Sequence, residues 1–291
     1  MTRSQAWIEG MRLRTLPVSA AGVIAAIGMA AACGYAIPWG WAIVCLLFAL
    51  LAQIASNFAN EYFDYKAGID GADRQGPQRG VANGIISPRA MLIATVGTLA
   101  LACTIGLLTL LRGEWWLLPA GIGIALGALA YSTGPYPLSR HCLGEAAVII
   151  FYGLVPVCLT FYVLTLTLHW SVILCGFGIG CWGAMVILVN NYRDIASDSA
   201  SGKHTLSTTL GPQGSAMVYL ALGQFAAASL WISGGIAWGV LPILPAAMGF
   251  GISAVLNKGG LSGAQCTRLL AVTAIALLVT STLFCIIQLV Q

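Results

Sequence analysis

The sequence predicts an all-α integral membrane protein, a bundle of nine transmembrane helices. Three observations support this fold class: the composition, the number of long apolar stretches and the distribution of basic residues. Of the 291 residues, 59% are hydrophobic and 8% are charged, whereas soluble domains carry about 25% charged residues. A soluble core cannot use this much apolar sequence, so we expect the chain to lie in a membrane.

The predicted elements follow from the apolar stretches. A membrane-spanning helix needs about 20 consecutive, mostly apolar residues. Nine such stretches follow one another, at residues 15–35, 38–60, 90–111, 115–133, 143–164, 170–191, 213–233, 236–256 and 267–289. The polar segments between them are short, so we expect a single polytopic membrane domain over residues 1–291.

The basic residues orient this bundle. With nine spans, twelve of the thirteen Lys and Arg residues fall on one side of the membrane and only Arg112 falls on the other. Cytoplasmic loops are enriched in Lys and Arg, so we expect the N-terminus in the cytoplasm and the C-terminus outside. The same bias explains the formal net charge of +4. A nucleic-acid partner is not expected, because it would need a basic face on a folded domain.

The nine cysteines and three histidines do not indicate a zinc or redox site. Most of the cysteines lie singly within apolar stretches, with no C-x-x-C pair, and the histidines form no i, i+4 pair. Buried cysteine behaves as a small hydrophobic residue, and the usual ligand spacings are missing.

Acidic residues instead gather in short polar segments beside the spans. One group follows the second span, another follows the sixth, and a single acid opens the fifth. They are Glu61, Asp64, Asp70 and Asp73, then Asp194 and Asp198, then Glu145. Carboxylates are costly near a bilayer, so such clusters are candidates for function.

The two acidic segments repeat one spacing. Asn60 precedes Asp64 by four residues, and Asn190 precedes Asp194 by four, with Asp198 four residues further on. Residues four apart share one face of a helix, so each segment can present a stripe of oxygen atoms. Four spans separate the segments, which returns the chain to the same side in the same direction. We therefore expect the second and sixth spans to face each other across a cavity.

Facing carboxylates predict a metal–diphosphate site at the membrane surface. Mg²⁺ is usually held by one or two carboxylates together with phosphate oxygens of the substrate, and the ions would neutralise the leaving diphosphate. Nearby basic residues can bind the remaining oxygens: Lys66, Arg74, Arg79, Arg193 and Lys203. The alternative is that these Asp and Asn residues merely cap membrane helices; the matching register of two segments on one side disfavours it.

At these residues the sequence resembles the UbiA superfamily of intramembrane prenyltransferases. That family carries an N-D-x-x-D-type motif after the second span and a D-x-x-x-D motif after the sixth, and it folds as nine transmembrane helices around a central cavity. The resemblance covers essentially the whole chain in span order. One departure is Glu61, which stands where the family usually has Asp.

Within the superfamily, the sequence is most similar to the branch that prenylates 1,4-dihydroxy-2-naphthoate. Gly68 stands where the 4-hydroxybenzoate branch typically has Asp, and Asp70 follows two residues later. Further strings typical of the naphthoate branch are Arg12-Leu-Arg14-Thr-Leu-Pro17, Asn57-x-x-Asn60, Asp73 to Gly80, Asn190-Asn191-x-Arg193-Asp194, Gly202-Lys203 and Tyr131-x-x-Gly134-Pro135.

The resemblance implies a set of site residues. Mg²⁺ would be held by Asn60, Glu61, Asp64, Asp70, Asp194 and Asp198. The diphosphate would be bound by Arg74, Arg79, Lys66, Arg193 and Lys203, beside Asn57 and Asn190. The substrates would be a polyprenyl diphosphate, with its tail among the membrane lipids, and 1,4-dihydroxy-2-naphthoate, and the product would be demethylmenaquinone.

The implied mechanism begins with ionisation of the diphosphate to an allylic cation, with Asp64, Asp194 and Lys203 in catalytic roles. Aromatic faces stabilise cations, which gives Tyr131, Tyr136, Tyr152 and Tyr192 a candidate role; each could equally be an interfacial anchor. The naphthoate ring then attacks the cation, and loss of CO₂ restores aromaticity. Glu145 and His141 are candidate proton acceptors or ring-positioning groups, although Glu145 could simply cap its span.

The expected location is the bacterial cytoplasmic (inner) membrane, with several passes and a site opening to the cytoplasm. Three other readings remain open. An ion-coupled transporter would place its ionisable residues at mid-membrane on broken helices. A sister prenyltransferase with a 4-hydroxybenzoate, haem-O or chlorophyll-type acceptor would share the metal motifs. A non-catalytic membrane scaffold would not need two intact motifs.

Overall fold

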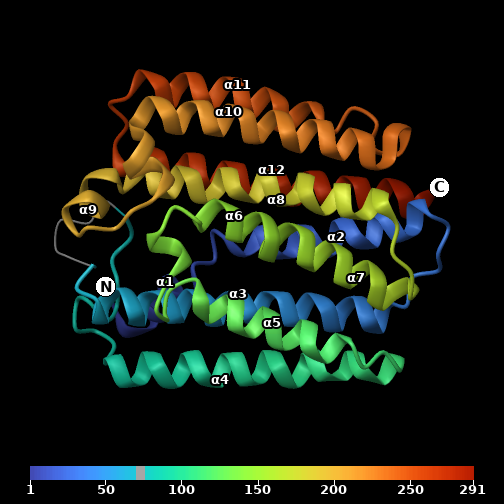
Figure 1. Cartoon of the computed structure of the whole chain (residues 1–291), viewed down its shortest axis with the longest axis horizontal. Helices are drawn as coiled ribbons and strands as arrows, with labels where there is room; N and C mark the ends of the chain where they lie inside the picture. Colours follow the sequence, from blue (N-terminus) through green and yellow to red (C-terminus); the bar gives the residue numbers. More distant parts are fainter. Residues whose placement is uncertain (70–75) are drawn as a thin grey trace.

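The computed structural model describes residues 1–69 and 76–291. Its helices lie alongside one another in one elongated bundle (Figure 1). Among the described residues the only bridge of β type is an isolated pair between His141 and His204. The predicted all-α fold class is therefore confirmed.

The helices follow the predicted apolar stretches closely. In chain order they are α1 (Arg3–Met11), α2 (Leu16–Ala32), α3 (Trp39–Lys66), α4 (Pro88–Leu107), η1 (Leu108–Arg112), α5 (Leu117–Ala130), η2 (Leu138–Arg140), α6 (Gly144–Val148), η3 (Ile149–Leu154), α7 (Val155–Thr165), α8 (Trp170–Arg193), α9 (Ile195–Ala200), α10 (Leu206–Gly234), η4 (Gly235–Trp238), α11 (Ile243–Lys258) and α12 (Gly263–Val290). Each predicted stretch thus contains helix, although the stretch at 143–164 divides into α6, η3 and α7 and that at 236–256 into η4 and α11.

Length separates these helices into two groups. Within the part of the chain that the structure describes, six helical segments are long and apolar enough to cross a membrane, and α1 with α2, which are bent by 41°, would make a seventh if they act as one span. The stretches predicted at 115–133 and 236–256 correspond to the shorter apolar helices α5 and α11. The chain is therefore a multi-pass membrane protein by the length and composition of its helices.

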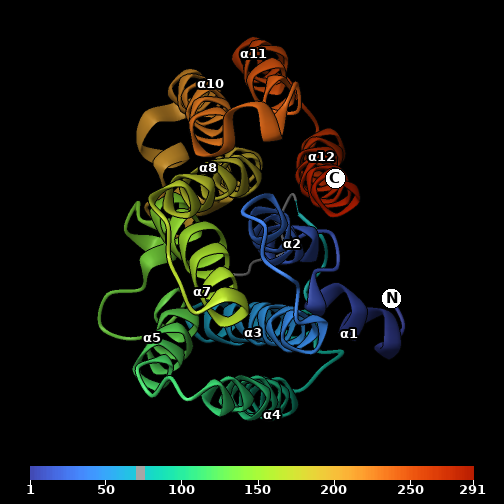
Figure 2. The same cartoon turned by 90° about the vertical axis from the view of Figure 1, so that its right-hand side faces the viewer.

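The bundle is built around α8. Seen along the helices, α10 and α11 lie at one extreme and α4 at the other, with α2, α7 and α8 between them (Figure 2). Small residues bring α8 against η3, a π-helical segment that links α6 to α7. A Cβ atom added to Gly153 of η3 would lie 2.3 Å from the Cα atom of Gly180. Glycine therefore permits backbone contact between these helices, as small residues do in membranes.

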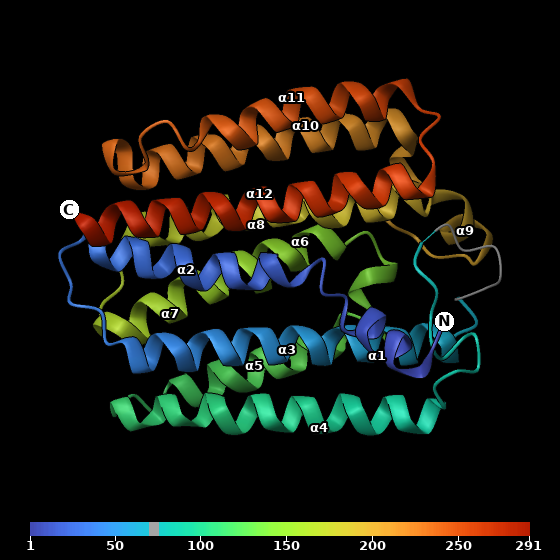
Figure 3. The ribbon, with the colours of Figure 1, turned by 180° about the vertical axis from the view of Figure 1, so that it is seen from behind.

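The polar segments meet at one end of the bundle. The C-terminal ends of α3 and α8 lie at the same end, beside α1 and α9 (Figures 1 and 3). The short helix α1 begins with a capping box between Thr2 and Gln5, and it packs through Ala6 onto Phe58 of α3. This small second core holds α1 at the end of the bundle where the acidic residues lie.

Candidate functional site

The two acidic segments line one polar cavity of about 230 Å³. Asn60 and Asp64 occupy the last turns of α3, and Asn190 occupies the last turn of α8. Asp194 stands between α8 and α9, and Asp198 lies on α9. The four-residue spacing places these side chains together because each segment continues the helix of its span. The cavity thus brings carboxylate and amide oxygens from two distant parts of the chain to one place.

Each carboxylate of this cavity is buried beside a basic side chain. An Oδ1 atom of Asp64 lies 3.1 Å from Arg140 Nη2, and Lys203 Nζ lies 3.2 Å from Asp198 Oδ2. A third pair joins Arg193 Nη2 to Asp194 Oδ2 at 2.7 Å. Buried charges need a partner of opposite sign, and each of these acids, at 3 to 6% exposure, has one.

Asn60 connects this cavity to α1. Its Oδ1 atom accepts hydrogen bonds from Arg12 and, at 3.1 Å, from Arg79, while its Nδ2 atom donates to Ser132 Oγ at 3.2 Å. Arg12 reaches it because α1 ends there with a left-handed backbone, at φ 52°. Arg12, Arg79 and Asn60 all line the polar cavity.

Two of the predicted metal ligands differ from the others in position. Glu61 does not line the cavity: its Oε1 atom accepts from the backbone N–H of Val81 at 3.0 Å, and its Oε2 atom lies 3.8 Å from Arg79 Nη1. Asp70 lies outside the described residues, as does Arg74 of the predicted diphosphate set. Among the residues that the structure describes, no group of three or more His, Cys, Asp or Glu side chains could by itself hold a metal ion.

The donor set of the cavity nevertheless fits Mg²⁺ bound together with a diphosphate. Asp64, Asp194 and Asp198 supply carboxylate oxygens, and Asn60 and Asn190 supply amide oxygens. All are hard ligands, and Mg²⁺ usually takes only one or two carboxylates and completes its octahedron with phosphate oxygens and water.

Some of the predicted diphosphate residues line the cavities and others do not. Arg79, Arg193 and Lys203 line the polar cavity or the one next to it. Lys66 is exposed on α3, with its Nζ atom 6.0 Å from the centre of the Tyr62 ring. Asn57 lines the neighbouring cavity and donates to the backbone oxygen of Met11 at 2.9 Å.

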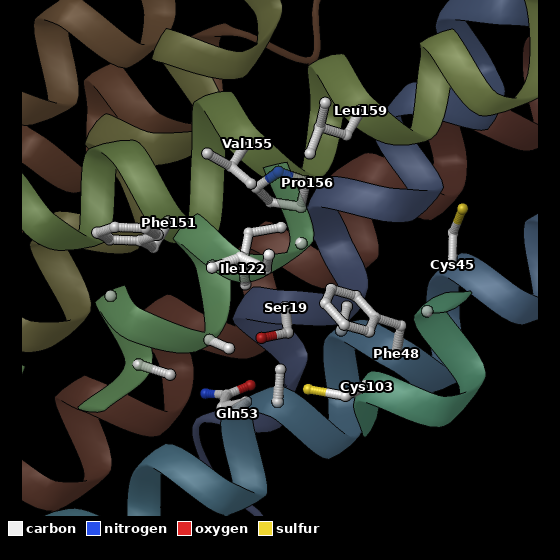
Figure 4. Close-up of a pocket in the computed structure, with 18 of the residues that line it drawn as sticks. Ser19, Cys45, Phe48, Gln53, Cys103, Ile122, Phe151, Val155, Pro156 and Leu159 are labelled. Carbon is white, nitrogen blue, oxygen red and sulfur yellow. The ribbon is translucent and has the colours of Figure 1, made fainter. Parts of the chain in front are cut away.

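Two further cavities share lining residues with the polar cavity. The second, of about 320 Å³, runs between α2, α3, α8 and α12 and shares Arg12 and Asn60 with the first. The third, of about 340 Å³, is almost entirely apolar and lies between α3, α5 and the α6–α7 segment (Figure 4). Tyr131 lines all three, and Tyr152 lines the second and third. These two phenol rings therefore stand where a polar and an apolar compartment join.

Four other candidates do not line any of these three cavities. Tyr136 stacks on His141, with ring centres 3.7 Å apart, in the loop before α6. Tyr192 donates to the backbone oxygen of Leu256 at 2.8 Å. Glu145 is buried, and its Oε1 atom accepts from Asn191 Nδ2 at 2.9 Å. Its Oε2 atom has no hydrogen-bond partner among the described residues.

Three residues of the site had no predicted role. The sequence predicts for Arg140 only its side of the membrane, and Arg12 belongs only to a string that is typical of the naphthoate branch. It predicts no role for Ser132. Arg12 and Arg140 approach Asn60 and Asp64 from 48 and 76 residues away. The spacing of residues along the sequence does not predict such partners. The only available signal was the number of clustered acidic residues, each of which needs a basic partner when it is buried.

Comparison with known proteins agrees with this geometry. Residues 21–267 match the model of the UbiA prenyltransferase family. The chain is 34% identical to the 1,4-dihydroxy-2-naphthoate octaprenyltransferase of Escherichia coli (strain K12), over 72% of this chain and 70% of the relative. It is also 34% identical to the enzyme of that name from Mycobacterium leprae (strain TN), over 74% and 73%.

Solved structures of low sequence identity share the fold. The apo structure of a UbiA homolog from Aeropyrum pernix K1 aligns with a TM-score of 0.68 at 18% identity, over 93% of this chain and 97% of the other. A UbiA homolog from Archaeoglobus fulgidus, solved with DMAPP and Mg²⁺, aligns with a TM-score of 0.66 at 13% identity, over 94% and 98%. By the match to the family model and by its identity to these relatives, the chain belongs to the UbiA prenyltransferase family.

Proposed function

We propose that the protein transfers a polyprenyl group from polyprenyl diphosphate to 1,4-dihydroxy-2-naphthoate, with loss of CO₂, in menaquinone biosynthesis. One observation supports this most directly: Tyr131 lines both a cavity with carboxylates and cations and a mostly apolar cavity. A substrate with a charged head and a long apolar tail needs both compartments. The relatives with 32 to 34% identity are named as octaprenyltransferases for this acceptor.

The polar cavity would hold the diphosphate head. Asn60, Asp64, Asp194 and Asp198 would bind Mg²⁺, which would supply positive charge to the departing diphosphate. Arg79, Arg193 and Lys203 would bind the other phosphate oxygens, as guanidinium and ammonium groups commonly do. We assign Glu61 to the support of the loop at Val81, because its carboxylate bonds that backbone.

The junction would hold the reacting carbon. When the C–O bond to diphosphate breaks, the allylic carbon is cationic, and the Tyr131 and Tyr152 rings are the aromatic faces that line the junction. A carbon of the naphthoate ring supplies the electron pair of the new C–C bond. Departure of the carboxylate as CO₂ returns an electron pair to the ring.

We propose that the chain crosses the cytoplasmic membrane of a bacterium nine times, as a single domain, with the N-terminus inside and the polar cavity open to the cytoplasm. In this arrangement α5 and α11 are crossings as well, despite their length. The twelve basic residues on one side support this orientation. The position of the two termini at opposite ends of the bundle supports an odd number of crossings (Figure 1).

A parallel assay tests the acceptor. Membranes that contain the protein are given octaprenyl diphosphate and Mg²⁺ with either 1,4-dihydroxy-2-naphthoate or 4-hydroxybenzoate. We expect product and CO₂ from the naphthoate alone. Product from the benzoate alone would retain the chemistry and reject the acceptor. A lack of product from both, in membranes where the protein is present and folded, would contradict the proposal.

A further inference from the structure

The apolar cavity contains two phenylalanine rings that rest on glycines of neighbouring helices. Phe48 of α3 lies against Gly106 of α4, where an added Cβ atom would be 2.9 Å from Cδ2 of the ring. Phe151 of η3 lies against Gly127 of α5, where an added Cβ atom would be 2.3 Å from Cζ. All four residues line the cavity. In each pair, the phenylalanine ring occupies the space that the side chain of any residue larger than glycine would fill.

The two pairs stand at different depths. Gly127 precedes the junction residue Tyr131 by four residues, or about 6 Å along the helix axis. Phe48 precedes Asp64 by sixteen residues of the same helix, or about 24 Å. Figure 4 shows the Phe48 ring directed into the cavity near Cys103, between Cys45 and Gln53 of α3. A tail that enters at the junction thus meets Phe151 early and Phe48 late.

The position of α4 decides where the Phe48 ring would move. In the end view α4 lies at one extreme of the bundle, with α3 and the remaining helices on one side of it (Figure 2). A methyl group at Gly106 would push the ring away from α4 and therefore towards the inside of the cavity. The free volume beside Phe48 depends on position 106 being glycine.

We propose that Phe48, seated on Gly106, is a specificity-determining residue that gauges the distal part of the prenyl tail. This inference rests on the proposed prenyltransferase function and refines its substrate class. A geranyl tail is too short to reach from the polar cavity to Phe48, whereas an octaprenyl tail must pass the ring. The Phe48–Gly106 pair therefore acts on long donors alone, and the Phe151–Gly127 pair acts on donors of every length.

The test compares kcat/KM for octaprenyl diphosphate with kcat/KM for geranyl diphosphate. Gly106→Ala should lower the ratio of long to short donor about tenfold or more, the usual effect of one methylene group in an apolar pocket. Gly127→Ala should lower both values together. Gly97→Ala on α4 and Gly123→Ala on α5 are matched controls, because a Cβ atom at either position meets no heavy atom within 4 Å. Alanine is also the better helix former, so none of these changes weakens its helix.

A double variant separates the ring from other effects of the methyl group. With Phe48→Ala, the ring that Gly106→Ala would displace is gone, so the double variant should regain the long-to-short ratio of Phe48→Ala alone. Two results would disprove this role of Phe48. One is a long-to-short ratio in Gly106→Ala equal to that in Gly97→Ala. The other is a double variant whose long-to-short ratio is still lower than that of Phe48→Ala alone. Both values of a ratio are measured on the same sample, so poor folding of a variant lowers kcat/KM for both donors equally and leaves the ratio unchanged. Failure of the proposed function would instead appear as a wild-type protein that uses neither donor.

Discussion

Arg140 and Asp64 form an ion pair across 76 residues of sequence, with Nη2 3.1 Å from Oδ1. The same nitrogen donates to the backbone oxygens of Phe63 at 3.3 Å and Ser132 at 3.4 Å. Arg140 therefore ties the loop before α6 to the end of α3 and fixes the direction of the Asp64 carboxylate. If Asp64 binds Mg²⁺ as proposed, Arg140 would act on that site through Asp64, as a positioning residue.

We expect Arg140→Ala to raise the Mg²⁺ concentration for half-maximal activity by about 10- to 100-fold, the usual effect of removing the partner of a metal ligand. Arg140→Lys should restore part of the loss, since it keeps the positive charge but not the planar guanidinium group. A Mg²⁺ titration of membrane activity measures this. Arg89→Ala, at an exposed position, is the control, and an equal shift there would disprove the role.

Asp64→Ala and Asp194→Ala should each lower Mg²⁺-dependent turnover by more than about 100-fold, beyond the effect of losing a ligand's partner. Each change removes a carboxylate from the polar cavity and leaves the arginine that pairs with it, Arg140 or Arg193, without that partner. Turnover is measured with octaprenyl diphosphate and the naphthoate, and chromatography in detergent checks that the variants remain folded. Wild-type turnover in both folded variants would show that the metal site lies elsewhere.

Glu61 permits a separation of structural from metal-binding roles. Glu61→Gln retains an oxygen for the N–H of Val81, so we expect little change in stability or in Mg²⁺ requirement. Glu61→Ala leaves that buried N–H without its acceptor, which costs about 1–3 kcal/mol. Thermal unfolding in detergent and a Mg²⁺ titration distinguish the two. A large increase in the Mg²⁺ concentration that Glu61→Gln requires would instead support Glu61 as a metal ligand.

The ring of Tyr131 should matter more than its hydroxyl group. Tyr131→Phe keeps the aromatic face, and we expect kcat within about threefold of wild type. Tyr131→Leu removes the face and should lower kcat about 10- to 30-fold, corresponding to a desolvated cation–π contact of up to about 2 kcal/mol. Steady-state kinetics at saturating substrates measures both. Tyr136→Leu is the control, because that ring is exposed and stacked on His141; a matching loss there would point to general destabilisation.

The helices and the shared cavity were predictable because both follow from local periodicity. Apolar length identified the helices, and a spacing of four residues put Asn60 with Asp64 and Asn190 with Asp194 on stripes that line one cavity. Contacts over long separations were not predictable: Arg140 and Arg12 find their acids and amides through the packing of α1 and of the loop before α6. The same holds for Glu61, whose spacing resembles that of a ligand while its carboxylate bonds the backbone of Val81.

The glycine contact between η3 and α8 has a mechanical meaning for the apolar cavity. With Gly153 against Gly180, backbone meets backbone, and no side chain remains there that could change rotamer to give way. That wall is stiff. The opposite wall is α5, whose Gly121 and Gly123 face open space. On the proposed function, a bulkier tail would therefore displace α5 more readily than η3.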